Sequence, residues 1–348
     1  MRHSIIFLAL CAGTVSAFAQ PYTIRSLGNG TSAQRLLDDG RILVSGGAAG
    51  TASVWQNGVL TPIGIPTADV PIVTDFNGNG IFGGTTNKFI SPGNRIEKAF
   101  TWSQGNPSIT FYNAGASAVK SGISRINQNG LLIGWGKLTA SSFVQTSFRD
   151  IGSGAQYLDP IGSPTILSDI NALGHAVGSR NGGTDNFVWN SDGSVVNLSG
   201  GPGFASVITE SSRIFGHASG ALKEWNLAGA EVASWDFTGS YITGGINDTN
   251  ESGLSVGLLQ TEGGDLVPFL WTGSGAAIDL RTQITNSSSY RLLRVDGINA
   301  SGMMMGTAEN LSTGQYEAVA IQAVPEPATI LVLGGAIAGM ISRRKRQY

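Results

Sequence analysis

The segment Ile170-Asn171-Ala172-Leu173-Gly174-His175-Ala176-Val177-Gly178 decides the fold of this chain, because its pattern recurs along the sequence. An Asn followed by a Gly predicts a tight turn, and the short apolar run after that Gly predicts a β-strand. Variants of the pattern occupy residues 38–44, 77–83, 126–134, 208–216, 246–257 and 298–306, the copy at 208–216 being the most degraded. A turn and a strand that recur in this way predict a repeat protein made of β-strands.

A second marker follows each copy of the turn and keeps the same period. It is a strand that ends in a large apolar residue, and its positions are 36 to 50 residues apart: Trp55, Trp102, Phe148, Trp189, Trp225, Trp271 and Ile321. A further short strand comes next, as at Leu60–Gly64 and Val195–Leu198. Each unit therefore holds about four strands in about 44 residues, which is the size of a β-propeller blade, and the Trp set predicts a structural layer between blades.

The two ends of the repeat region complement each other. The last unit reaches its marker strand at residues 317–322 and then runs into the C-terminal tail, so that its fourth strand is missing. Tyr22–Gly28 has the pattern of that strand, and pairing it with the last unit closes a ring without an open sheet edge. The sequence thus predicts an all-β fold, a β-propeller of seven four-stranded blades over residues 20–323, closed by the N-terminal strand.

Composition agrees with a β-rich exported body. The chain has 50 Gly in 348 residues, and no window sustains an apolar period of helical type. Without residues 1–19 and everything from Pro325 onward, 22 acidic and 16 basic residues remain, a net charge of about −6. Nucleic acid requires clustered Lys and Arg, so this balance argues against nucleic-acid binding.

The N-terminus has the layout of a secretory signal peptide. Arg2 precedes an apolar run, and Ala17 and Ala19 form an A-x-A cleavage site for signal peptidase. We expect residues 1–19 to be removed and the mature chain to begin at Gln20. Cys11 leaves with this segment, so that no disulfide can form in the exported protein.

The C-terminal tail, residues 324–348, combines three features. Pro325, Glu326 and Pro327 predict an extended segment that is open to an enzyme. Residues 328–341 are largely apolar and span about 21 Å as a helix, less than the ~30 Å hydrocarbon core of a bilayer. A basic cluster, which would hold the chain end on the cytoplasmic face, consists of Arg343, Arg344, Lys345 and Arg346.

This tail resembles the PEP-CTERM sorting signal of Gram-negative bacteria. The resemblance implies recognition by an exosortase, a short transmembrane helix that anchors the chain transiently in the inner membrane, and delivery to the outer surface or extracellular matrix. The repeats also resemble the HAF repeats of exported bacterial proteins, best over residues 170–198 and 246–280. Lys98 and Val267 stand where that family has its His, so no site is carried over from it.

Asp75, Asn77 and Asn79 are the candidate metal ligands, because they match the start of a calcium-binding loop; residues 248–253 are a looser copy. Thr86 stands where the loop needs its closing bidentate Glu. The same residue types suit a tight turn between strands, and the blade turn is the interpretation that we favour. We therefore expect no cofactor, with Ca²⁺ as the alternative.

No catalytic constellation is visible in the sequence. His175 and His217 occupy different positions of the repeat, and the mature chain has no third His for a zinc site. Polysaccharide hydrolysis needs two carboxylates across the bond to be cleaved, and the ring could bring together Asp169, Asp236 and Asp296.

Two functions stay open at this point. The first is a non-enzymatic surface or matrix protein whose propeller binds exopolysaccharide or another exported partner. The second is an exported carbohydrate-active enzyme with carboxylates at the propeller channel.

Overall fold

The computed structural model describes residues 21–324 except 30, 47–50, 68, 92–93, 113–119, 138–144, 153, 159–163 and 238–240. The predicted signal peptide (1–19) and the sorting tail from Pro325 onward lie outside the described residues. Within the described ranges, no helix has the length and apolar character needed to cross a membrane.

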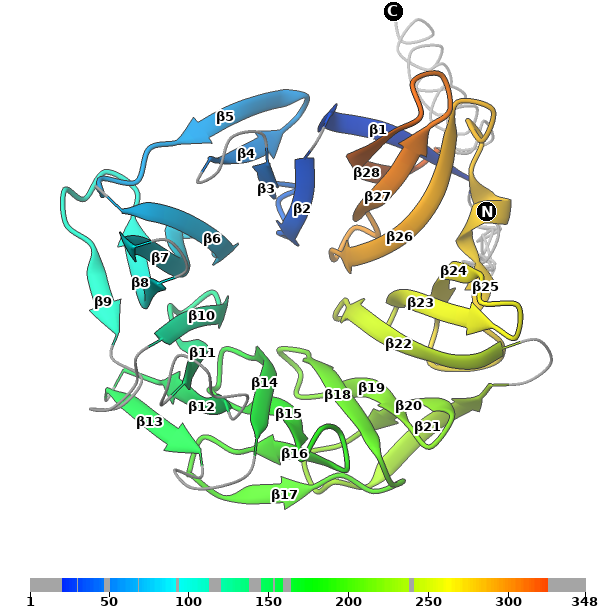
Figure 1. Ribbon diagram of the computed structural model, residues 1–348. Coiled ribbons are helices and arrows are strands. Elements are labelled where there is room, and N and C mark those ends of the chain that lie inside the picture. Colours follow the sequence, from blue (N-terminus) through cyan, green and yellow to red (C-terminus); the bar gives the residue numbers. More distant parts are fainter. Residues whose placement is uncertain are drawn as a thin grey trace, which may run out of the picture.

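The strands form small antiparallel sheets that stand side by side around a central axis, so that the molecule is a ring (Figure 1). The strands nearest the axis are β2 (Thr31–Leu36), β6 (Val70–Phe76), β10 (Lys120–Ile126), β14 (Thr165–Ile170), β18 (Gly203–Ile208), β22 (Tyr241–Thr249) and β26 (Tyr290–Ile298). The second strands are β3 (Ile42–Gly46), β7 (Ile81–Ser91), β11 (Leu132–Lys137), β15 (Ala176–Arg180), β19 (Ile214–Ala218), β23 (Ser255–Thr261) and β27 (Met304–Asn310).

The third strands are β4 (Ala52–Gln56), β8 (Asn94–Ser103), β12 (Gln145–Asp150), β16 (Asp185–Trp189), β20 (Ala221–Trp225), β24 (Leu266–Trp271) and β28 (Gln315–Ala323). The outer strands are β5 (Val59–Ile63), β9 (Thr110–Tyr112), β13 (Ala155–Leu158), β17 (Val195–Asn197), β21 (Glu231–Asp236), β25 (Ile278–Asp279) and β1 (Tyr22–Asn29). A 3-10 helix, η1 (Leu280–Gln283), follows β25.

Strand order groups the described strands in fours. Five sheets have four strands each, and an eight-stranded sheet combines β6–β9 with β10–β13 through one parallel bridge between Glu97 and Lys120. The all-β propeller class that the sequence predicted is therefore confirmed, and the grouping in fours matches the predicted blade.

The N-terminal strand closes the ring as predicted. β1 lies antiparallel to β28, with Tyr22 opposite Ala323 and Ser26 opposite Val319. The backbone amide of Val324 donates to the carbonyl of Pro21 at 2.7 Å, so the ladder extends one residue past both strands. The chain thus leaves no unpaired edge on β28, in accordance with the need to protect sheet edges.

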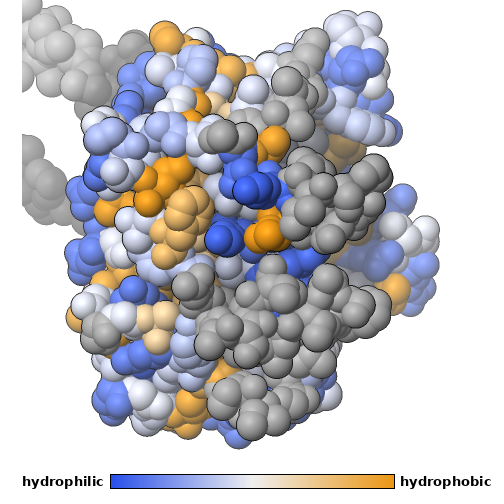
Figure 2. Space-filling model, turned by 60° about the vertical axis from the view of Figure 1, so that its left-hand side comes forward, coloured by the Kyte–Doolittle hydropathy of each residue, from blue (hydrophilic) through white to orange (hydrophobic). Residues whose placement is uncertain are grey.

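The hydrophobic core lies between neighbouring blades. In one cluster, Phe215 and Leu222 of the β18–β21 blade pack against Phe269 and Trp271 of the β22–β25 blade, and all four side chains are fully buried. The Trp residues that mark the repeat thus form a layer between blades, as expected. Val59 and Leu60 of outer strand β5 are exposed. On the face that Figure 2 shows, apolar side chains are interspersed with polar ones.

Where a blade turn begins with Asn, that Asn connects neighbouring blades. Asn127 Oδ1 accepts from the backbone amides of Asn129 and Leu131, at 3.0 and 2.9 Å, and thereby stabilises its own turn. Asn127 Nδ2 donates at 2.6 Å to the carbonyl of Asn171 in the next blade. The same link to the following blade is made by Asn77, Asn171, Asn250 and Asn299.

One repeat is aligned differently from the expectation. The pattern at residues 246–257 suggested Asn247 as the turn residue, but Asn250 makes the turn contacts, accepting from Ser252 and Leu254. Asn247 lies inside β22, where its Nδ2 donates to the carbonyl of Val295. An Asn fits both the strand position of Asn247 and the turn position of Asn250, so the spacing of the motif alone indicated the wrong residue.

Asn127→Asp tests the link between blades. The carboxylate keeps both acceptor contacts within the turn but places an oxygen against the carbonyl of Asn171. We expect a loss of about 1–3 kcal/mol in the free energy of unfolding, measured by urea denaturation. Asn226→Asp is the matched control, because exposed Asn226 makes the same turn contacts, to Ala228 and Ala230. Equal losses in the two variants would contradict the role of the link.

Candidate functional site: the central channel

Every inner strand has a register shift shortly before its turn, and these bulges place charged residues at one level of the channel. Five inner strands contribute a charged residue at the equivalent position, two residues before the turn position. We call this set the charge belt; it consists of Arg35, Asp75, Arg125, Asp169 and Asp248.

The aspartates of the charge belt also connect blades. Asp75 is fully buried, and its Oδ2 accepts from the backbone amide of Ile126 at 2.6 Å. Asp169 and Asp248 accept in the same way from the amides of the next inner strand, at 3.0 and 2.9 Å. Asp75 Oδ1 lies 3.5 Å from Arg35 Nε. Each carboxylate therefore accepts a hydrogen bond that joins two blades and also belongs to the charge belt, which contains both arginines and aspartates.

The charges of the belt act on one another. Burial raises the pKa of Asp169 to about 6, although the positive charges of Arg35 and Arg125 oppose this shift. Burial also raises the pKa of Asp248 against the same two arginines. For Arg35, burial lowers the pKa, but the attraction of Asp75 and of further carboxylates outweighs it and the net direction is upward. Arg35 and Arg125 thus lie among the three aspartates of the belt, with which their charges interact.

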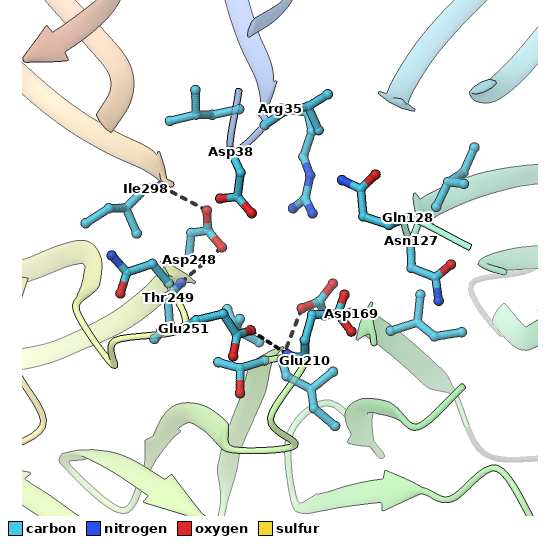
Figure 3. Close-up of a pocket in the computed structure, with 18 of the residues that line it drawn as sticks. Arg35, Asp38, Asn127, Gln128, Asp169, Glu210, Asp248, Thr249, Glu251 and Ile298 are labelled. Atoms are coloured by element: carbon cyan, nitrogen blue, oxygen red, sulfur yellow. Dashed lines mark hydrogen bonds between the residues drawn. The ribbon is translucent and has the colours of Figure 1, made fainter. Parts of the chain in front are cut away.

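On the turn side of the belt, the channel narrows to a compartment of about 130 Å³ (Figure 3). Its rim carries Asp38, Glu210 and Glu251. These carboxylates also accept backbone amides from a neighbouring blade, as Asp38 does from Ala300 at 2.9 Å. The narrow compartment is acidic, and its carboxylates serve first to join the turns of adjacent blades.

On the other side of the belt, the channel opens into a wide compartment of about 540 Å³. Hydroxyl and amide side chains dominate its lining: Ser32, Gln34, Ser168, Ser206, Asn247 and Thr307. Its charged residues are Arg125, Arg294 and Asp296, of which the last two form an ion pair. This lining offers many hydrogen-bond donors and acceptors around a space of ligand size.

The structure separates the three aspartates proposed for hydrolysis. Asp169 lines the narrow compartment and Asp296 the wide one, whereas Asp236 is exposed on outer strand β21. The expectation that the ring could bring them together was wrong, because Asp236 lies on the outer strand of its blade and not on an inner strand that lines the channel. Asp248 is instead the aspartate that shares a compartment with Asp169.

The two histidines have ordinary structural surroundings. His175 Nδ1 accepts from the backbone amide of Ser191 at 3.2 Å. His217 packs on the ring of Phe204, with 5.5 Å between centroids, and burial lowers its pKa. Among the residues that the structure describes, no group of three or more His, Cys, Asp or Glu could hold a metal ion.

The predicted calcium ligands are engaged in turn and interblade contacts. Asn77 Oδ1 accepts from the amides of Asn79 and Ile81, and Asn79 Nδ2 donates to the carbonyl of Gln128 at 2.8 Å. Asp75 points instead at Ile126 and Arg35. These contacts support the interpretation of the segment as a blade turn.

Sequence reasoning missed the charge belt and the wide compartment. Arg35, Arg125 and Asp248 drew no attention as a set, although each precedes the turn position by two residues. When the repeats are aligned on their turns, these charged residues share one column, two residues before the turn position. That column was the signal that could have found them.

Asp169→Asn tests the electrostatics of the belt. A raised pKa means that Asp169 contributes stability below about pH 4, and that this contribution is lost as the pH rises through about 6. The amide keeps an acceptor for Ile208 and carries no charge. We expect the variant to be more stable than the wild type at pH 8 by about 1–2 kcal/mol, and similar at pH 4. Urea denaturation at both pH values measures this; an equal difference at the two would contradict it.

Comparison with known proteins locates the sorting signal. Residues 323–346 match the family model described as the PEP-CTERM protein-sorting motif. The chain therefore carries a PEP-CTERM sorting motif. This motif marks an exported protein with a C-terminal sorting signal and is consistent with processing by an exosortase. No curated protein matches the chain in sequence.

Solved structures that resemble the chain share its fold. Catalytically inactive virginiamycin B lyase from Staphylococcus aureus with quinupristin has a TM-score of 0.54 at 11% identity, over 87% of this chain and 100% of that one. The β-propeller domain of Cps50 (Swd1) from Myceliophteria thermophila has a TM-score of 0.52 at 10% identity, over 88% and 100%. At such identities the likeness shows the propeller fold alone, in agreement with the ring in Figure 1.

Proposed function

We propose that this protein is an exported propeller that binds a polysaccharide outside the cell and catalyses no reaction on it. The wide compartment is the observation that carries this proposal. Its volume of about 540 Å³ lies within the range of ~300–1,000 Å³ typical of ligand pockets. Hydroxyl and amide side chains both donate and accept hydrogen bonds, as the hydroxyl groups of a sugar do.

The PEP-CTERM motif supports the cellular setting of this proposal. Signal peptidase would cleave after Ala19, the tail would hold the chain in the inner membrane, and an exosortase would then release it. The destination would be the outer surface or extracellular matrix of a Gram-negative bacterium, with exopolysaccharide as the ligand. The HAF-repeat resemblance stays a prediction that fits this setting.

A binding function fits the channel better than catalysis does. The narrow compartment holds Asp169 and Asp248, whose pKa values burial raises, but its volume of about 130 Å³ is below the range of ligand pockets. Burial also raises the pKa of Asp296 in the wide compartment, where this carboxylate is paired with Arg294. Asp169 and Asp248 each also hold a backbone amide of the next blade. Both carboxylates therefore already serve to join neighbouring blades of the ring.

The alternative is an exported carbohydrate-active enzyme. The observation in its favour is Asp169, whose pKa of about 6 suits a general acid, in the same compartment as Asp248. If this alternative holds, reducing-end assays with the wild type will show polysaccharide cleavage that Asp169→Asn abolishes. Absence of cleavage over a panel of polysaccharides rejects it.

A glycan array probed with the full-length protein in detergent tests the binding function. We expect at least one polysaccharide fragment to bind, and Ser206→Leu, which fills the wide compartment, to weaken that binding by about tenfold or more. Ser274→Leu is the control, because Ser274 lies in an exposed turn. Binding to no glycan, or equal binding by both variants, contradicts the proposal.

A further inference from the structure

Arg125 is the third charged residue of the wide compartment, besides Arg294 and Asp296. No hydrogen bond or ion pair involves its guanidinium within the part of the chain that the structure describes, whereas Arg294 and Asp296 pair with each other. Arg125 lies at the bulge of β10, where the charge belt meets the wide compartment. A cation thus stands at the inner end of a cavity lined by neutral polar groups.

We propose, on the basis of the polysaccharide-binding function above, that the ligand carries carboxylate groups and that Arg125 binds one of them. A guanidinium has planar, parallel N–H groups that match the two oxygens of a carboxylate. The sugar of this class is a uronic acid, which combines a carboxylate with ring hydroxyl groups. Gln34, Ser168 and Ser206 lie in the same compartment to receive those hydroxyl groups.

The charge balance favours a carboxylate over a phosphate group. Asp169 and Asp248 lie close enough to Arg125 to interact with its charge. Their negative charges weaken the attraction of Arg125 for any anion, whereas the cost of removing an anion from water grows roughly with the square of its charge. The other cation of the compartment, Arg294, is occupied by Asp296. The site therefore suits a singly charged group rather than a phosphate monoester.

The test compares two probes of equal size. Tetragalacturonate carries one carboxylate on each sugar, and its fully methyl-esterified form keeps the hydroxyl groups without the charge. Isothermal titration calorimetry on the full-length protein in detergent should show tetragalacturonate binding about tenfold or more tightly than the ester. Raising the salt concentration should weaken the binding of the acid and leave that of the ester unchanged.

Variants then assign the preference to Arg125. Arg125→Gln should remove the preference for the acid and keep the binding of the ester, and Arg125→Lys should keep part of the preference. Ser168→Asp retains Arg125 but adds a negative charge to the same compartment, so it should also lower the affinity for the acid. This second variant keeps the test valid if Arg125→Gln fails to fold, which circular dichroism will show.

The outcomes separate this inference from the function on which it rests. Equal binding of acid and ester, or binding of neutral glycans only, overturns the role of Arg125 and leaves polysaccharide binding intact. A preference for the acid that survives in both Arg125→Gln and Ser168→Asp places the carboxylate elsewhere and also overturns it. Binding to no glycan overturns both proposals together.

Discussion

Replacing Ile24 by Asp is expected to destabilise the whole ring, by about 3–5 kcal/mol. Ile24 is 4% exposed on β1 and packs in a core cluster with Val319 and Ile321 of β28. The substitution buries a carboxylate among apolar side chains and weakens the strand that closes the propeller. Because a domain has only about 5–15 kcal/mol of stability, this loss should clearly lower the temperature of thermal unfolding.

Thermal unfolding followed by circular dichroism measures this effect. Val59→Asp is the matched control: Val59 also belongs to an outer strand, β5, but is 64% exposed and should tolerate the charge within about 0.5 kcal/mol. The comparison isolates ring closure from the general cost of a charge in an outer strand. Similar unfolding temperatures for Ile24→Asp and the wild type would show that β1 is not needed to hold the ring together.

Arg149→Ala is the second substitution expected to have a large effect, with a loss of about 3–5 kcal/mol. The side chain of Arg149 is fully buried between two blades, although it carries a charge. Its Nη1 donates to the carbonyls of Gly174, Trp189 and Asn190, at 3.0, 3.1 and 2.7 Å. Its guanidinium also lies 3.9 Å from the ring centroid of Trp189. Removal leaves a cavity and buried carbonyl groups without donors.

Arg149→Lys should recover only part of this stability, because an ammonium group cannot reach all these carbonyls or stack on Trp189. Arg41→Ala is the control: Arg41 also donates to a carbonyl of the next blade, that of Gly78, but at an exposed site. Its loss should be below about 1 kcal/mol in urea denaturation. A comparable loss for Arg41→Ala and Arg149→Ala would contradict the importance of the buried position.

The sequence predicted the features that depend on neighbouring residues. The turn at residues 77–80 needs Asn and Gly for local geometric reasons, and the short apolar run of a strand such as β19 is typical of a buried strand. Ring closure by Tyr22–Gly28 could also be predicted, because a missing strand at one end and an extra one at the other are both visible in the repeat. Each of these inferences compares a segment with its own copies.

The candidate site could not be predicted in the same way. Arg125 and Ser168 line one compartment although they are 43 residues apart, and Arg294 belongs to it from the other end of the chain. Whether Asp236 or Asp248 faces the channel depends on which strand of the blade carries it. Composition and spacing do not contain that information when the acidic residues differ from one repeat to the next.

The sequence by itself therefore determined the repeated blade, the closing strand and the sorting motif, because each is a pattern within a short segment. Only the tertiary structure decided that bulges in successive inner strands bring the charge belt to one level and place Arg125 at the inner end of a wide polar compartment. The physical reason is that the channel forms when inner strands of separate blades converge on one axis. Its charges are then set by residues that no local pattern connects.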